Sequence, residues 1–220
     1  MIPEKEFALR ADPLPDLLKA LYEFYPIGLP SLGEMYPGKR KIMEIVRGKQ
    51  SILQNNDGDY QKLVREIGAV YPKQTVRMEN NAGAPSLSLS IIFREDELTL
   101  ERPEVIKIKI VISLLAPNYT VFFENLVLFS SQGEVPFRRY VNIISANDKR
   151  YDPAREIVIK VKALVEKYFV GFTYAPHGTL FNHKVESGVP FGIEYPNNLQ
   201  YSIFDFLFDP DYHKQQVMLM

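Results

Sequence analysis

The chain contains no cysteine among its 220 residues. Without cysteine there is no disulfide, no thiolate nucleophile and no zinc site with sulfur ligands. Long apolar runs are also lacking, because the longest, residues 110–116, is interrupted by Ser113 and is far shorter than the roughly 20 residues that span a bilayer. Charged residues between Glu4 and Arg10 break any apolar core of a signal peptide. The sequence therefore predicts a cytoplasmic protein that neither crosses nor binds a membrane.

An excess of one charge is absent as well. The 26 Lys and Arg residues nearly balance the 27 Asp and Glu residues, which gives a net charge of -1. The most basic stretch holds Lys39, Arg40, Lys41, Arg47 and Lys49, and a solvated helix face explains it as well as a phosphate-binding surface does. The balance of charge does not favour nucleic acid as a partner.

Sequence motifs for known chemistry are missing too. Neither a G-x-S-x-G elbow nor an S-x-x-K run is present, so no nucleophilic serine can be identified. The phosphate-binding patterns G-x-x-x-x-G-K-[ST] and G-x-G-x-x-G do not occur either. The sequence therefore predicts no cofactor and no metal, and it leaves the oligomeric state open.

What is present is the composition of an ordinary globular protein, with 46% hydrophobic and 24% charged residues, and we expect one domain over residues 1–220. Residues 12–71 are predicted to be helical. Asp12-Pro13 supplies a cap and a proline at the first helical position, and apolar residues then recur at helical spacing. A second helix is predicted at about 39–47, and a third follows the turn at 57–59.

Residues 75–146 change to the period of two that is typical of strands with one buried face. The connections between these strands are too short for crossover helices, so we expect an antiparallel meander of four to five strands. The helices are expected on one face, with Lys107 and Lys109 pointing away from it. The side chains predicted to form the core are Leu87, Leu89, Ile91, Ile108, Ile110, Ile112, Val161 and Leu164.

A capped apolar stripe predicts one more helix over residues 152–170. Residues 171–220 are predicted to be an irregular aromatic and acidic segment, in which 199–208 fits a helix as well as a strand. The fold class is therefore α+β, an antiparallel meander with N-terminal helices and one C-terminal helix packed on one face.

Two hypotheses about a site arise from the last fifty residues. His177, His183 and Glu186 lie close in sequence and have the groups to bind a metal ion or act as a general base, which makes a hydrolase or a metal-dependent enzyme one alternative. The competing interpretation is exposed or capping histidines, because residues six apart lie on opposite sides of a helix.

The other hypothesis is a protein-binding surface between Glu186 and Tyr212. No Lys or Arg lies between Lys184 and Lys214, whereas five acidic and seven aromatic residues lie between Glu186 and Tyr212. Aromatic anchors with an acidic rim suit a basic partner protein, although burial of the aromatics in the core explains the pattern too. The proposed binding residues are Phe204, Asp205, Phe206, Phe208, Asp209 and Asp211. With no catalytic motif, the sequence favours a non-enzymatic cytoplasmic protein-binding or adaptor protein.

Overall fold

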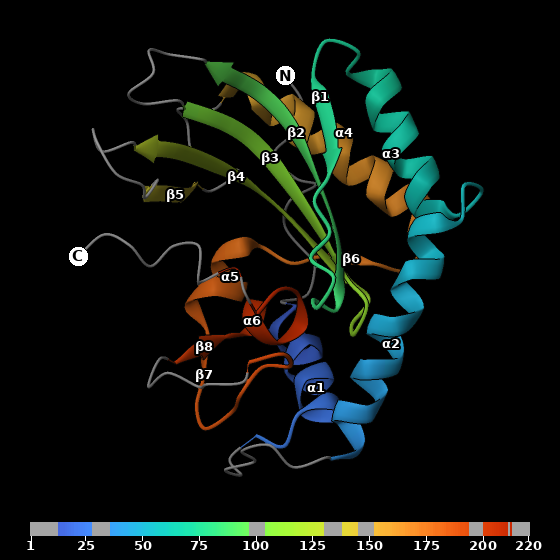
Figure 1. Ribbon diagram of the computed structural model, residues 1–220, viewed down its shortest axis with the longest axis vertical. Coiled ribbons are helices and arrows are strands. Elements are labelled where there is room, and N and C mark those ends of the chain that lie inside the picture. Colours follow the sequence, from blue (N-terminus) through green and yellow to red (C-terminus); the bar gives the residue numbers. More distant parts are fainter. Residues whose placement is uncertain are drawn as a thin grey trace, which may run out of the picture.

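The computed structural model describes residues 13–27, 36–96, 104–129, 138–144, 152–193, 200–210 and 212. Helices and one main sheet form an α+β fold (Figure 1), as the sequence predicts. In chain order the elements are α1 (Leu14–Phe24), α2 (Pro37–Gln54), α3 (Asp59–Val70), β1 (Thr75–Met78), β2 (Ser86–Asp96), β3 (Glu104–Ser113), β4 (Asn118–Phe129), β5 (Arg138–Ile144), α4 (Asp152–Tyr168), β6 (Thr173–Tyr174), α5 (His177–Asn182), β7 (Lys184–Val185), β8 (Tyr201–Ser202) and α6 (Ile203–Leu207).

The three N-terminal helices form where apolar periodicity and start signals agree. In α1 the buried residues Leu17, Leu21 and Phe24 are three or four apart, so they form one stripe toward the core. Helix α2 extends to Gln54, seven residues beyond its predicted end, because Gly48 does not stop it. A glycine within a helix costs only about 1 kcal/mol relative to alanine, which the rest of the helix offsets.

The main sheet is an antiparallel meander in the order β1-β2-β3-β4-β5, which confirms the predicted topology. The short strand β6 lies off this path and pairs in parallel with the start of β4. The turn at residues 114–117 joins β3 and β4, and Ile112 lies opposite Tyr119 across it. Short connections of this kind permit only antiparallel neighbours.

One face of the sheet packs against α3 and α4. All the predicted core residues lie in this layer, with Leu164 partly buried at its margin. Tyr60, Leu63 and Ile67 come from α3, and Val161 and Val165 come from α4. The predicted inward face is therefore confirmed.

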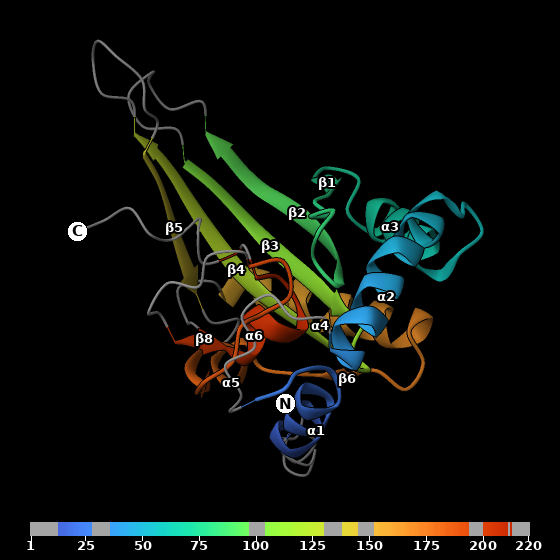
Figure 2. The same cartoon turned by 60° about the horizontal axis from the view of Figure 1, so that its bottom comes forward.

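The opposite face is also covered, which corrects the expectation of a solvated face. Lys107 and Lys109 point away from the α3–α4 layer as predicted, yet both are buried. The serines that alternate along β2 are buried too: Ser86, Ser88 and Ser90. Helices α1, α5 and α6 pack against Val111 and Phe122 on this face and form a second core. Figures 1 and 2 show these helices gathered at one end of the molecule, while the strands continue past them.

The described part of the C-terminal segment thus forms a structural layer, whereas the sequence predicted the segment to be irregular. Residues 199–208, left open between helix and strand, contain both: two residues of β8 and five of α6. A capping box starts α6, in which the Asp205 carboxylate accepts hydrogen bonds from the Ser202 N–H at 2.6 Å and from its hydroxyl at 2.7 Å. Among the described residues, no helix combines the length and the apolar character that a membrane span needs.

Candidate functional site

A groove of about 470 Å³ separates α1 from β7 and the turn that follows it. Both elements lie at the same end of the molecule as α5 and α6 (Figures 1 and 2). The groove is lined by Leu14, Leu18, Leu21, Tyr22, Ile27, His183, Lys184, Val185, Glu186, Ser187 and Ile203. A volume of several hundred Å³ is within the range of ligand and peptide sites.

The two walls of the groove differ in chemistry. The α1 wall is apolar, because Leu14, Leu18 and Leu21 recur at helical spacing on one side of the helix. Tyr22 stands beside them with 64% of its surface exposed, which is unusual for a large aromatic side chain. The opposite wall carries the polar groups of residues 183–187 around the buried Val185. The groove therefore has an apolar surface along α1 and polar groups along the opposite wall.

The predicted histidine and glutamate residues are only partly brought together. His183 and Glu186 line the groove, whereas His177 packs its ring against Phe122 and Phe181, with centroids 6.5 and 6.4 Å away. The Nδ1 atom of His183 lies 2.8 Å from the Thr179 carbonyl oxygen. Within the described ranges, no set of three His, Asp or Glu residues is placed to hold a metal ion. His177 therefore does not contribute to a site with the other two residues.

Burial lowers the pKa of the His177 imidazole below its ordinary value of 6.5. The unfolded chain then binds a proton at a higher pH than the folded chain does. The contribution of the neutral, buried His177 to the free energy of unfolding is fully present above pH 6.5. This contribution falls as the pH drops toward the folded-state pKa. We expect urea unfolding to show this loss between pH 7 and pH 5 in the wild type. The His177→Phe variant should lose less stability over this range than the wild type does. An unchanged pH profile in His177→Phe would contradict this account.

The structure corrects the predicted aromatic surface. Phe204, Phe206 and Phe208 are 0% exposed and Asp205 is 1% exposed, so these four residues belong to the core and offer no contact to a partner. Asp209 is half-buried and accepts a hydrogen bond from Asn81 Nδ2 at 3.1 Å. Asp211 lies outside the described residues. The acidic rim expected around exposed aromatics is therefore not formed by the described part of this segment.

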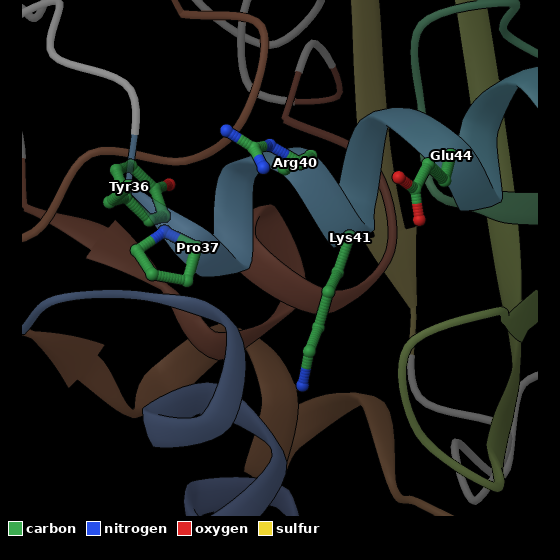
Figure 3. Close-up of a pocket in the computed structure, with 5 residues that line it drawn as sticks. All are labelled: Tyr36, Pro37, Arg40, Lys41 and Glu44. Carbon is green, nitrogen blue, oxygen red and sulfur yellow. The ribbon is translucent and has the colours of Figure 1, made fainter.

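A smaller pocket of about 240 Å³ lies at the start of α2 and is lined by Tyr36, Pro37, Arg40, Lys41 and Glu44 (Figure 3). Lys41 extends toward α1, where its Nζ lies 3.3 Å from Glu23 Oε1, and Arg40 extends the other way. Further along α2, Lys49 is buried and donates to the Asn81 and Ala84 carbonyls at 2.5 and 2.6 Å. The residues of the basic stretch therefore make different contacts. Lys41 pairs with Glu23, whereas Lys49 is buried and binds backbone carbonyl groups.

A buried ionic cluster lies on the second face of the sheet. Lys107 Nζ lies 2.8 Å from Glu79 Oε2 and 2.9 Å from Glu124 Oε2, and Lys109 Nζ lies 3.1 Å from Glu79 Oε2. The Tyr212 hydroxyl donates to the Glu124 carboxylate. Burial alone would raise the pKa of Glu79, but the two lysines outweigh it and lower that pKa to about 2. The cluster joins Glu79, which directly follows β1, and the strands β3 and β4 to the C-terminal segment.

Sequence reasoning missed both the groove and this cluster. The apolar residues of α1 predicted only an amphipathic helix, because periodicity does not show where one element stops covering another. For the cluster a weak signal exists: β3 alternates two lysines with isoleucines, and the next strand carries Glu124, which pairs with Lys107 in the register.

The chain matches no family model, no curated protein and no solved structure in the three comparisons.

Proposed function

We propose that this chain is a non-enzymatic protein-binding or adaptor protein of the cytoplasm, and that its partner docks in the groove between α1 and β7. The observation that carries the proposal is the exposed Tyr22 at the edge of an apolar wall. Tyrosine is among the residues that contribute most to binding at protein interfaces, because it combines a large apolar surface with a polar hydroxyl. The proposal moves the binding surface from the buried phenylalanines to this groove.

The alternative, a hydrolase or metal-dependent enzyme, has less support. His177 packs in an aromatic cluster outside the groove, and no hydrogen bond joins His183 to Glu186 or Ser187 within the described residues. A general base must reach its proton partner, and this arrangement supplies no such contact. Protein binding needs only the shape and apolar character that the groove has.

The proposal is tested with the Tyr22→Asp variant. A partner captured from the host with the tagged chain is first purified, and its affinity is then measured by calorimetry. We expect Tyr22→Asp to weaken binding by about 30-fold or more, as replacement of an anchor residue does. The matched control is Ile159→Asp, because Ile159 is 52% exposed on α4, outside the residues that line the groove. Equal affinity of the wild type and Tyr22→Asp would place the binding surface elsewhere.

A further inference from the structure

The two cores use the main sheet to different extents. The α3–α4 core takes side chains from the centres of β2, β3 and β4: Leu87, Leu89, Ile91, Ile108, Ile110, Ile112, Tyr119, Val121 and Phe123. From the described strands of the main sheet, the second core takes only Val111 and Phe122, and the turn between β3 and β4 adds Leu115 and Ala116. Most of its other members belong to α1, α5 and α6. The second core is therefore built mainly between helices.

The sheet face below the second core is polar where the face below α3 and α4 is apolar. In the strand register, Val111 lies between Ser88 of β2 and Thr120 of β4. The hydroxyl oxygens of Ser88 and Thr120 are buried and have no hydrogen-bond partner among the described residues. Burial of such a group costs free energy that water returns when the group is exposed. Exposure of this face to water is therefore less unfavourable than exposure of the apolar face.

The elements that cover this face at the end of the chain pack on one another. We name α5, β7, β8, α6 and Tyr212 the C-terminal layer. The Phe122 ring of β4 meets the rings of Phe181 and Phe204, with centroids 5.8 and 6.1 Å away. Those two rings stack on each other at 4.4 Å, and the Tyr212 ring lies 5.3 Å from that of Phe204. Because these side chains support one another, we expect them to leave the sheet together.

The C-terminal layer can leave without breaking the main sheet. The last backbone contact before it is the Ala175 N–H, which donates to a carbonyl of β4 at 2.8 Å. None of the described residues from α5 to Tyr212 belongs to a strand of the main sheet. Side-chain hydrogen bonds connect the layer to the sheet, from the Ser113 hydroxyl to the Leu207 carbonyl at 2.7 Å and from the Tyr212 hydroxyl to Glu124. Detachment breaks these contacts but no hydrogen bond between β1, β2, β3, β4 and β5.

We infer that the C-terminal layer opens as one cooperative unit while the main sheet, α3 and α4 stay folded. Contiguous elements with their own packing are the units that open at a lower free energy than global unfolding requires. The groove has α1 on one wall and β7 on the other, so it exists only while the layer is closed. Opening therefore takes the groove apart and switches off binding there. Only this consequence rests on the proposed function, because opening is measured without a partner.

Hydrogen exchange of single amides, followed by NMR at pH 7 in increasing urea, detects the opening. The probes in the layer are the N–H groups of Leu180 and Phe208, which donate to the Pro176 and Phe204 carbonyls. The reference amides are those of Ile110 in β3 and Val161 in α4. We expect the probes to exchange about 100-fold faster than the reference amides. Both probes should share one urea dependence, because a unit that opens as a whole exposes the same surface for each.

The decisive variant is Ile67→Val, which removes one methyl group from the α3–α4 core. That core stays formed in the open state, so the variant makes global unfolding easier but leaves opening unchanged. We expect the reference amides to exchange about threefold faster or more, and the probes to stay within about twofold of the wild type. The matched control is Ile203→Val, since Ile203 is equally buried but lies in the layer. It should accelerate probes and reference amides alike, because both opening and global unfolding become easier.

Two results would overturn the inference. If Ile67→Val accelerated the probes as much as the reference amides, the layer and the sheet would unfold as a single unit. If exchange of the probes did not depend on urea, the short helices would fray locally without a cooperative opening. Either result would leave the proposed function standing, because the groove would then be a permanent feature of the folded chain.

Discussion

Replacing Lys107 with methionine is expected to lower the free energy of unfolding by about 3–5 kcal/mol, because it breaks a buried ion pair from one side. The side chains of Lys107 and Glu124 are only 6% and 1% exposed, and their charged atoms lie 2.9 Å apart. Methionine keeps most of the apolar stem of lysine but supplies no positive charge. Glu124 would then lose its positively charged partner in a site with little water, which is costly however the carboxyl group responds.

Chemical denaturation at pH 7 measures this loss, and two further variants separate its cause. The exposed Lys160→Met on α4 also removes one positive charge and should change the stability by less than about 0.5 kcal/mol. Adding Glu124→Gln to Lys107→Met should recover part of the loss, because the uncompensated charge is then removed. A double variant as unstable as the sum of both single variants would contradict the pairing.

The second large effect is expected for Phe204→Ala, which should cost about 3–5 kcal/mol of stability. The Phe204 ring is fully buried and stacks on Phe181 and Phe208, with centroids 4.4 and 5.2 Å away. It also meets the rings of Phe122 and Tyr212 at 6.1 and 5.3 Å. Truncation would leave a cavity between α5, α6 and the sheet, and the surrounding rings can fill it only in part.

Tyr22→Ala provides the comparison for this prediction, since it truncates an aromatic residue of similar size at an exposed position. We expect its unfolding midpoint in urea to stay close to that of the wild type, while the midpoint of Phe204→Ala falls markedly. If Phe204→Ala were as stable as the wild type, the ring would not be part of the core, and its role as a binding anchor would have to be reconsidered.

The elements that sequence reasoning placed correctly are those specified by local physics. In α4 a cap, a proline in the first turn and an apolar stripe agree, and the helix forms as predicted despite its β-branched residues. The strands β2 to β4 alternate with period two, and their short connections leave only antiparallel pairing. The inward face then follows from the identity of every second residue.

The candidate site could not be predicted in the same way, because it depends on contacts between distant parts of the chain. Tyr25 donates its hydroxyl proton to the Phe206 carbonyl at 2.7 Å, across 181 positions of sequence. Contacts of this kind place α1 beside the β7–β8 pair and so create the groove. Aromatic composition alone does not distinguish a core from an interface, since both bury aromatic rings.

The sequence by itself determined helices α1 to α4, the meander and its apolar face, since capping, periodicity and connection length act within a few residues of one another. Only the tertiary structure decided that the second face is covered. A strand with lysines and serines on one side is predicted to face solvent on that side. The pattern shows that these side chains are polar, but not which groups elsewhere in the chain pair with them. In this chain Glu79, Glu124 and the C-terminal helices supply those partners from other elements. Ion pairs and hydrogen bonds offset the cost of burying these polar and charged side chains, and both depend on the assembled fold.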